Sequence, residues 1–477
     1  MSISSGRELL ACLRSELVGA DVEVPLLSGG TRRYVSLDNA ASTPTFTRIM
    51  DRVNEFMRFY ANVHRGEGFR SRLSSWAFDE ARRVVAGFVK ADPRKDAVIF
   101  TKNTTESLNK LSRLFRFRPD GVCLTSLMEH HSNELPWRRV ARVEHVAVRD
   151  DGSLDLEDYD RKLAQFAGRL DLVALTAASN VSGWVNPVHL LARKAHEAGA
   201  RFVLDAAQLA AHRPLDMKPH GHPEHVDFLA FSAHKMYAPY GVGALVGDRE
   251  ELLKSGPESV GGGTVDIVTI EDAYFRDLPD REEAGTPDIV GVVALAAAIR
   301  LLEAVGWDAI IEHENRLTRY ALERLRRIPG LCIYGSSDPA DAGRRLGVIA
   351  FNVAGHNHSL VAAILSHEAG IGVRGGCFCA HPYMLRLLAV SEAEAEKVRR
   401  EIIARDRSGI PGAVRASFGI CNDETDADAL VAALELVAEG RYRGRYRMSK
   451  ETGTCFPEGA AGPDFGRYFC LTPRGCS

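Results

Sequence analysis

The chain has 477 residues, of which 45% are hydrophobic and 26% are charged. This composition is typical of a globular protein with more than one domain, and it excludes a disordered chain and a collagen-like fibre. The 60 basic and 63 acidic residues give a formal net charge of −3, so there is no excess of positive charge to attract nucleic acid or an anionic membrane. Nine cysteines are too few for a disulfide scaffold in a chain of this length, and we expect free thiols.

The first residues, MSISSGRELLACLRSEL, predict a short amphipathic helix. They lack the basic start followed by an apolar stretch that marks a signal peptide. The longest apolar run, residues 289–299, is too short to cross a bilayer. We therefore expect a cytoplasmic protein that contacts no membrane.

Strand-like and helical patterns alternate along most of the chain. Short apolar runs predict buried parallel strands at 97–100, 122–126, 171–176, 201–205, 226–232 and 243–247. Amphipathic patterns predict helices between them, for example at 76–91 and at 187–199, where Asn-Pro and Gly mark the two ends. Such alternation indicates an α/β fold with a mostly parallel sheet between layers of helices.

The pattern changes after residue 288. We expect helices at 289–305, 308–328, 359–369, 391–404 and 427–439, with strands at 346–353 and 414–418. The predicted organisation is therefore an N-terminal arm (1–36) that belongs with the small domain, a large α/β domain (37–288), a small α+β domain (289–440) and an irregular tail (441–477). The tail holds Cys455, Cys470 and Cys476, either as a sulfur-relay arm or, as we prefer, as a plain extension.

Three separate segments together predict a pyridoxal-phosphate site. Lys235, in SAHK, follows a buried strand, where α/β folds place their ligands, and its amine can form a Schiff base. Asp205 ends an earlier strand and would suit a protonated pyridine nitrogen as its partner. Thr104 and Thr105, between a strand and a helix, are typical of a phosphate-binding site, although in isolation an ordinary helix cap explains them better. His130 lies between these segments, where it could stack on the ring and carry protons, or be a structural histidine.

The order of motifs resembles the class V aminotransferase family of fold-type I pyridoxal-phosphate enzymes, and within it the cysteine desulfurases and selenocysteine lyases of the SUF-pathway type. The resemblance runs from about residue 37 to about residue 439. It is carried by DNAAS, NVHRG, NTTES, MEHHSN, SNVSG, DAAQ, SAHK, EAGTP and RGGCFCAHP, in that order. Any one of these motifs is weak, whereas nine in sequence are specific.

The resemblance implies a role for each matching residue. Lys235 would bind the cofactor covalently, with Asp205 on the pyridinium, Gln208 on the ring hydroxyl and His130 on the ring face. The phosphate would be held by Thr104, Thr105, Ser232 and His234, and by Thr286 of a neighbouring subunit, which implies a homodimer. The substrate-binding residues would be Ala41, His64, Asn180, Arg374 and Arg415, and the catalytic residues Lys235, His130 and Cys379.

The segment RGGCFCAHP selects among class V chemistries, because Cys379 matches the catalytic cysteine of the SUF-type desulfurases. Its thiolate would take the sulfur of L-cysteine as a persulfide, leaving alanine, and would pass it to a protein acceptor. The chain departs from that family in having Cys377 and Phe378 where histidines are common, a feature similar to the desulfurase domain of molybdenum-cofactor sulfurases. Cys377 could be a resolving thiol, a second persulfide carrier or inert, and both cysteines could simply be small buried residues.

Two further patterns could bind metal. A Cys-x-Cys pair lacks a second pair at zinc-finger spacing, and HGHPEH, with His220, His222 and His225, is explained more simply as a polar loop before a strand. We therefore expect no metal.

The leading hypothesis is thus a cytoplasmic, homodimeric cysteine desulfurase. The alternatives are a class V C–S lyase, epimerase or aminotransferase acting on another amino acid, and a sulfur carrier without activity of its own.

Overall fold

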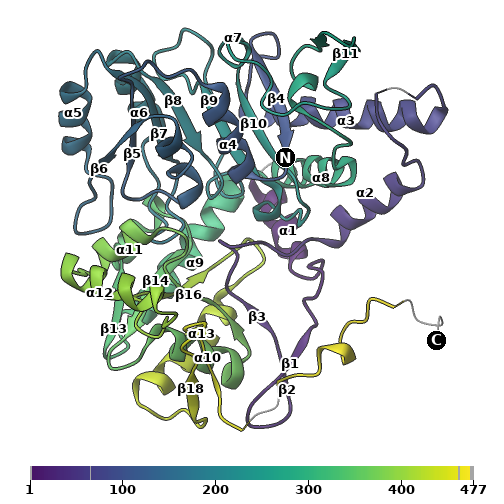
Figure 1. Cartoon of the computed structure of the whole chain (residues 1–477). Helices are drawn as coiled ribbons and strands as arrows, with labels where there is room; N and C mark the ends of the chain where they lie inside the picture. Colours follow the sequence, from purple (N-terminus) through teal and green to yellow (C-terminus); the bar gives the residue numbers. More distant parts are fainter. Residues whose placement is uncertain (1–2, 65, 460–461, 473–477) are drawn as a thin grey trace.

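A seven-stranded sheet runs through the larger half of the molecule, shown in the upper part of Figure 1. The computed structural model describes residues 3–64, 66–459 and 462–472. The strand order is β4-β10-β9-β8-β7-β5-β6, and only β10 pairs antiparallel with its neighbours. Its strands are β4 (Asp96–Thr101), β5 (Val122–Ser126), β6 (Arg142–Val146), β7 (Leu170–Thr176), β8 (Arg201–Asp205), β9 (Phe228–Ser232) and β10 (Gly243–Asp248). The predicted α/β fold with a mostly parallel sheet is confirmed.

The strand that the sequence did not predict is β6, RVEHV, at the end of the sheet. It is polar and only partly buried, whereas the other edge strand, β4, is buried throughout, so β6 lacks the apolar run that identified the other six. Alternate residues of a strand point to opposite faces of the sheet, and here they contribute to two separate cores. Val98 and Phe100 of β4 belong to the main core, whereas Ala97 and Ile99 belong to a second one on the other face.

Helices cover both faces of this sheet. Helix α4 (Thr104–Leu114) packs on β9 and β10, and α6 (Val188–Glu197) packs on β8. Helix α3 (Phe69–Val89), which begins seven residues earlier than its pattern predicted, packs against α8 (Ile289–Val305), as does α2 (Thr47–Met57). The remaining helices of this half are α5 (Leu156–Gln165) and the short α7 (Arg249–Leu253).

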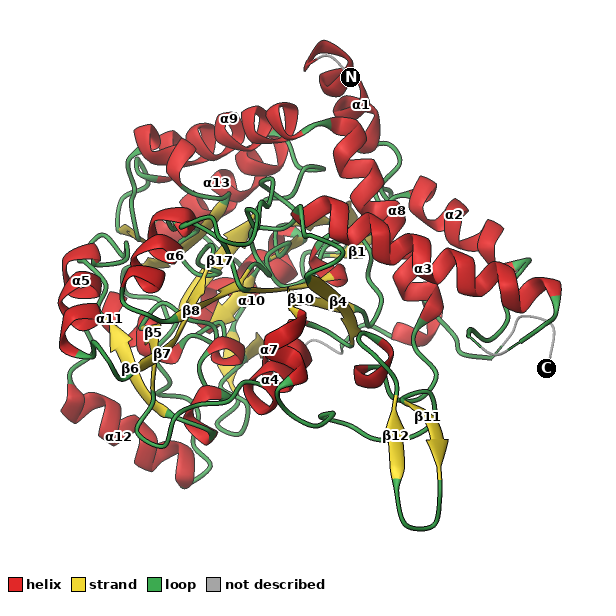
Figure 2. Cartoon of the chain, turned by 90° about the horizontal axis from the view of Figure 1, so that it is seen from above, coloured by secondary structure: helices red, strands yellow, loops and turns green. Residues whose placement is uncertain are grey.

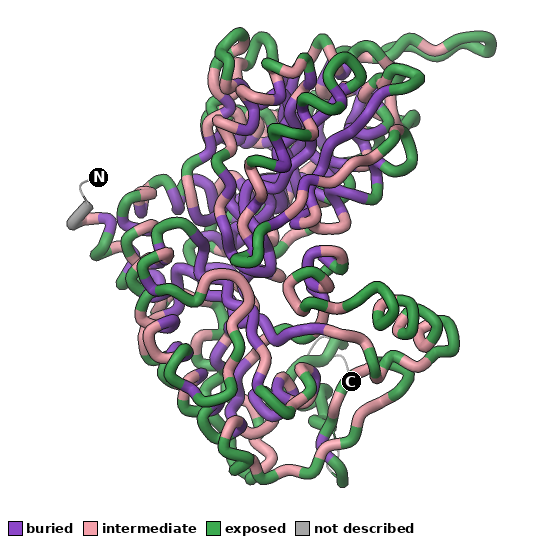
Figure 3. The backbone as a smooth tube through the Cα atoms, turned by 90° about the vertical axis from the view of Figure 1, so that its left-hand side faces the viewer, coloured by how far each residue is buried: buried purple, intermediate pink, exposed green. Residues whose placement is uncertain are grey.

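The smaller half has its own sheet and its own core. Figure 3 shows buried segments of the chain in both halves. Its strand order is β13-β14-β17-β16, with β13 (Leu331–Tyr334), β14 (Val348–Val353), β16 (Arg374–Gly376) and β17 (Ala413–Ser417). Its helices are α9 (Trp307–Leu325), α10 (His358–Ala369), α11 (His381–Leu387), α12 (Glu392–Ile403) and α13 (Glu424–Ala438). Helix α12 buries none of its residues.

The packing crosses the expected domain boundary at residue 288. Helix α8 contributes Val292, Leu295 and Ile299 to the core of the larger half. The N-terminal arm is likewise shared: α1 (Ile3–Leu13) packs on α8 and α9, whereas β3 (Val35–Ser36) pairs with β15 (Ile371–Gly372) of the smaller half. Between α1 and β3, a hairpin joins β1 (Glu23–Pro25) and β2 (Thr31–Arg33).

The expectation of an irregular tail is wrong in one part. Strands β18 (Tyr446–Met448) and β19 (Cys455–Pro457) form a hairpin that packs on α10, and the backbone N–H of Cys455 donates to Ser359 Oγ at 2.8 Å. Three-residue strands leave no periodicity in the sequence, so tertiary contacts determine this hairpin. Cys476 lies outside the described residues.

A second hairpin, of β11 (Val265–Val268) and β12 (Ala273–Phe275), projects from the larger half (Figure 2). It carries exposed apolar side chains, of which Ile270 is fully exposed. None of the described helices is by itself long and apolar enough to cross a bilayer; only α8 and α9 taken together, across an 80° bend, reach that length and hydropathy.

Candidate active site

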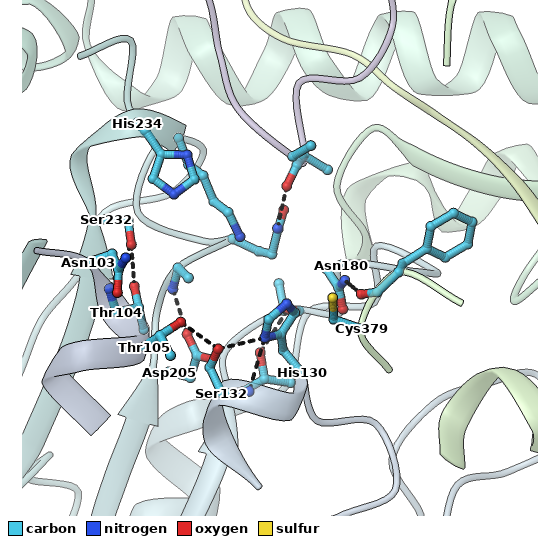
Figure 4. Close-up of a pocket in the computed structure, with 18 of the residues that line it drawn as sticks. Asn103, Thr104, Thr105, His130, Ser132, Asn180, Asp205, Ser232, His234 and Cys379 are labelled. Carbon is cyan, nitrogen blue, oxygen red and sulfur yellow. Dashed lines mark hydrogen bonds between the residues drawn. The ribbon is translucent and has the colours of Figure 1, made fainter. Parts of the chain in front are cut away.

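A cavity of about 460 Å³ lies where the carboxyl ends of the parallel strands meet the smaller half. Ligands bind in this position in open α/β sheets, because loops leaving the strand ends converge there. Residues that the sequence singled out and that line the cavity are Ala41, Thr104, Thr105, His130, Asn180, Asp205, Gln208, Ser232, His234, Lys235, Arg374, Cys379 and Arg415. In Figure 4, the labelled side chains, among them Thr105, His130 and Asp205, surround this cavity.

One end of the cavity is lined by the start of α4. Asn103 caps this helix by accepting from the N–H of Glu106 at 3.0 Å. Ser232, at the end of β9, joins the helix to the sheet: its Oγ accepts from the N–H of Thr104 at 2.8 Å and lies 2.7 Å from Thr104 Oγ1. Hydroxyl groups and backbone N–H groups at the start of a helix form a suitable binding site for an anion.

Asp205 is the last residue of β8, and Lys235 follows the end of β9 by three residues. The Asp205 carboxylate is buried, and among the described residues only the N–H of Ala207 hydrogen bonds to it, at 2.9 Å. Burial raises the pKa of Asp205, partly opposed by that hydrogen bond and by Lys235. Burial also lowers the pKa of Lys235 to about 8, although the negative charge of Asp205 opposes this shift by raising the pKa. Two groups that are costly to bury without a partner therefore face one cavity.

His130 is held in one tautomer by the segment that follows β5. Its Nδ1 accepts from the N–H of Ser132 at 3.1 Å and lies 3.0 Å from Ser132 Oγ, which in turn lies 2.7 Å from Thr105 Oγ1. Burial, together with Lys235, lowers the pKa of His130 to about 3. The ring is therefore neutral at physiological pH and carries its proton on Nε2.

Two arginines line the opposite end. Arg415 is buried in β17 and donates to the carbonyl of Asn180 and to Asp38 Oδ1, both at 2.9 Å. Arg374, in β16, is paired with the same Asp38 at 2.8 Å. The buried Nε of Arg415 has no hydrogen-bond partner among the described residues. This end of the cavity is suited to a carboxylate, which guanidinium groups bind in a bidentate manner.

Cys379 reaches the cavity from a tight loop between β16 and α11. Phe378 and Cys379 both adopt left-handed backbone conformations, with φ of 53° and 56°. The loop is held from the larger half, because Asn180 Nδ2 donates to the carbonyl of Phe378 at 2.7 Å and the N–H of His131 donates to that of Cys379 at 2.8 Å. The thiol of Cys379 is exposed.

Cys377 differs from Cys379 although only one residue separates them. It is buried, is absent from the cavity lining and donates from Sγ to the carbonyl of Pro411 at 2.9 Å. Burial raises the pKa of its thiol to about 11, with Cys379 adding to the effect. A protonated, buried thiol is a poor nucleophile.

Two residues expected at the site lie elsewhere in this chain. His64 lines a separate surface depression, and Thr286 lines another one beside α8. Conversely, the sequence assigned no role to Asn103, Ser132 or Asp38, although each of them contacts and orders a group of the cavity. Asn103 could have been found as a helix cap before Thr104, whereas Asp38 meets its two arginines only through tertiary structure.

Comparison with known proteins identifies the family. The model of the class-V aminotransferase family matches residues 35–430. The chain belongs to the class-V aminotransferase family. A probable cysteine desulfurase of Streptomyces coelicolor is 36% identical over 419 residues, which cover 85% of this chain and 92% of that protein. A cysteine desulfurase of Haloferax volcanii is 35% identical over 433 residues, covering 88% and 94%.

Solved structures agree with this assignment. The apo structure of the cysteine desulfurase of Thermococcus onnurineus matches with a TM-score of 0.77 at 32% identity, covering 90% of this chain and 98% of that one. A cysteine desulfurase of Escherichia coli matches with a TM-score of 0.73 at 27% identity, covering 91% and 99%.

The cavity fits the cofactor of this enzyme family, pyridoxal phosphate. The under-bonded Asp205 offers a partner for a ring nitrogen, and no described residue hydrogen bonds to the Lys235 amine. The start of α4 with Ser232 would hold the phosphate, and His130 would cover the ring. Gln208 is already engaged, since its Nε2 donates to the carbonyl of Ala40 at 2.8 Å, but its Oε1 stays available for a ring hydroxyl.

Proposed function

We propose that this class-V family member is a pyridoxal-phosphate-dependent cysteine desulfurase that converts L-cysteine to L-alanine and holds the sulfur as a persulfide on Cys379. The observation that carries the proposal is an exposed thiol lining the same cavity as the lysine–aspartate pair and the two arginines. Membership of the family alone leaves several reactions open. The thiol is what distinguishes sulfur transfer from transamination or epimerisation.

Each group of the chain then has a defined task. Arg415, Arg374 and Asn180 bind and orient the substrate carboxylate. When bound, the cofactor supplies an electron sink for negative charge at the substrate Cα. The amine of Lys235, with its pKa near 8, is suited to move a proton at that carbon. Neutral His130 donates from Nε2 without adding positive charge beside Lys235.

The sulfur step conserves atoms and electrons without an external oxidant. The Sγ of Cys379 attacks the substrate sulfur, a new S–S bond forms and the Cβ–S bond breaks. The electron pair returns to the substrate carbon, which gains a proton and becomes the methyl group of alanine. The thiol proton ends on the persulfide, so cysteine and one thiol give alanine and one hydropersulfide.

The decisive experiment compares Cys379→Ala with Cys377→Ala. Cys379→Ala should lower alanine formation from cysteine roughly 10²-fold or more, because the acceptor of the sulfur is removed. Cys377→Ala, its matched control in the same loop, should stay within about threefold, since that thiol is buried and protonated. A wild-type yield of alanine from Cys379→Ala would contradict the proposal. Formation of pyruvate and ammonia in place of alanine would indicate β-elimination.

We further propose that the active enzyme is a homodimer in which Thr286 of one subunit completes the phosphate site of the other. The support is that Thr286 lies outside the cavity of its own chain, close in sequence to a projecting hairpin with exposed Ile267, Ile270 and Tyr274. Mixing inactive Lys235→Ala with a Thr286→Ala variant of low activity should restore activity in hybrid dimers, because one of the two sites is then intact. Sites contained in one chain would show no such gain.

A protein sulfur acceptor and a cytoplasmic location complete the proposal. The exposed thiol could deliver its sulfur to another protein, and the eight described cysteines are all free, as expected in a reducing compartment.

A further inference from the structure

A second cluster of chemically active side chains lies at the opposite end of β4 from the cavity. It consists of Asp96, the first residue of β4, with His220 and His225 from the loop between β8 and β9. One potential ligand atom of each residue lies within 4.8 Å of those of the other two. The strand has six residues, so at roughly 3.3 Å per residue the cluster is about 17 Å from the cavity end of β4. It is a separate feature and does not depend on the proposed desulfurase activity.

The two histidines are presented by a tightly folded loop. Lys218 and Gly221 adopt left-handed conformations, with φ of 58° and 83°. The rings of His220 and His225 lie 4.3 Å apart between centroids. His220 Nε2 and Asp96 Oδ1 are 2.8 Å apart. Two histidines five positions apart in a loop therefore converge with a carboxylate from a distant strand. The sequence pattern HGHPEH drew attention to the histidines, but the carboxylate of Asp96 joins them only through the tertiary structure.

His225 provides an independent indication of a ligand. The residue is only 4% exposed, and its Nδ1 lies 3.0 Å from the carbonyl of Met217 and 2.8 Å from that of Lys218. Carbonyl groups only accept, so Nδ1 carries the ring proton and Nε2 keeps its lone pair. That Nε2 is buried and has no hydrogen-bond partner among the described residues. A buried acceptor without a donor is costly, and a cation would satisfy it.

The surroundings resemble the outer shell of a metal site. A metal-bound histidine usually donates its other ring N–H to a carbonyl, as His225 does. A ligating carboxylate is usually hydrogen-bonded as well, and Asp96 Oδ2 accepts from the N–H of Asp92 at 2.8 Å. His220 is half-buried, which leaves a route from solvent to the cluster.

We propose that Asp96, His220 and His225 bind a divalent transition-metal ion, with Zn²⁺ as the best match. Two imidazoles and one carboxylate, with water in the fourth position, form a common tetrahedral zinc set. Ligand atoms in such a set are roughly 3.3 Å apart, whereas the present atoms lie within 4.8 Å of one another, so the three side chains would draw closer together around the ion. The ion would bind the loop between β8 and β9 to the start of β4. This proposal departs from the expectation, drawn from the sequence, that the chain holds no metal.

The test uses the full-length holoenzyme, dialysed against a chelator and alkylated with iodoacetamide so that thiols cannot bind zinc. Isothermal titration with ZnCl₂ should show about one site per chain. Asp96→Asn and His225→Gln should weaken that affinity at least roughly tenfold. His222→Gln is the matched control, because His222 lies in the same loop but is exposed and outside the cluster, and it should leave the affinity unchanged.

Two further measurements test which residue types bind the ion and whether its binding stabilises the fold. Co²⁺ added in place of Zn²⁺ should give weak visible ligand-field bands in a difference spectrum, without the intense ultraviolet band of thiolate ligation. Zn²⁺ should raise the melting temperature of the wild type and of His222→Gln but not of Asp96→Asn. If Asp96→Asn fails to fold, His220→Gln, with its half-buried ring, replaces it.

The proposal is overturned if wild type and His225→Gln bind Zn²⁺ alike, if His222→Gln loses as much affinity as the cluster variants, or if Co²⁺ reports thiolate ligands. Alanine formation by Asp96→Asn should stay within about twofold of the wild type, because no residue of the cavity is touched. A variant that loses zinc binding but keeps its alanine formation would therefore show that the metal site can be tested independently of the desulfurase proposal.

Discussion

The two sides of the active-site cavity are built differently. On the cofactor side, Asp205, Ser232 and Lys235 lie at or just beyond the ends of adjacent strands of one sheet, so backbone ladders on both sides fix their positions. On the thiol side, Cys379 is carried by a short loop of the smaller half with two left-handed residues. Such a conformation in non-glycine residues costs on the order of 1 kcal/mol or more each.

That cost is offset by contacts from the other half. Asn180 and the N–H of His131 hydrogen bond to the carbonyls of Phe378 and Cys379, so the larger half determines where the thiol lies. Neighbouring strands of one sheet therefore position the cofactor side, whereas the thiol side depends on the packing of both halves.

The largest effect is expected for Lys235→Ala on the cofactor side. Alanine formation should fall roughly 10³-fold or more, because in the proposed mechanism Lys235 both attaches the cofactor and moves the proton. The visible cofactor band should disappear with it, while the rate of Cys379 alkylation should stay near the wild-type value. Lys254→Ala, an exposed lysine, serves as the control. Altered alkylation of Cys379 in Lys235→Ala would show that the two sides are not independent.

The next effect concerns the two cysteines of the loop. At pH 8, iodoacetamide should label Cys377 roughly 100-fold more slowly than Cys379, because a thiol with a pKa of about 11 has little thiolate at that pH. Labelling of Cys377 should accelerate as pH rises towards 11. Mass spectrometry of the single variants Cys377→Ala and Cys379→Ala assigns each rate. Equal rates would mean that the loop opens readily and that its contacts do not hold it.

A smaller effect should follow from Asp38→Asn, which acts on both arginines. Asp38 pairs with Arg374 and Arg415, and without its charge the two guanidinium groups repel each other. We expect the KM for cysteine to rise about tenfold with a smaller change in kcat, because Asp38 is a positioning residue outside the reacting atoms. Asp38→Glu should recover part of the loss. The control is Asp150→Asn, which removes the partner of the exposed Arg386 and should leave both KM and kcat unchanged. A fall in kcat without a rise in KM in Asp38→Asn would contradict the positioning role of Asp38.

The smallest effect is a pH dependence of stability from Glu129, beneath the cofactor side. Its side chain accepts from Ser126 and Asn133, yet burial raises its pKa from 4.5 to about 8. Between these values the folded protein keeps a proton that the unfolded chain releases. The free energy of unfolding should therefore fall as pH rises from 5 to 8, by at most about 1.4 kcal/mol per unit. Urea unfolding should show a flatter dependence in Glu129→Gln but not in Glu157→Gln, whose side chain is exposed.

The amino-acid sequence determined the class of fold and most of the cofactor side. Buried parallel strands have continuous apolar runs, and ligands gather at their carboxyl ends, so Asp205 and Lys235 could be expected at one edge of the sheet before any coordinates. A role for Ser232 came only from the resemblance to a known family. The polar edge strand β6 and the three-residue strands of the tail hairpin could not, because neither has a periodic apolar pattern.

Properties that depend on distant neighbours emerged only when the chain was folded. The resemblance singled out Cys379 but left the role of Cys377 open, and burial of Cys377 beside Pro411 is what makes its thiol protonated and unreactive. Asp38 meets its arginines, and Asp96 meets the histidines, across more than a hundred residues of chain. The ionisation, burial and hydrogen bonding of a side chain depend on the groups that folding brings within a few ångströms of it. A local sequence pattern does not identify those groups when they come from distant parts of the chain.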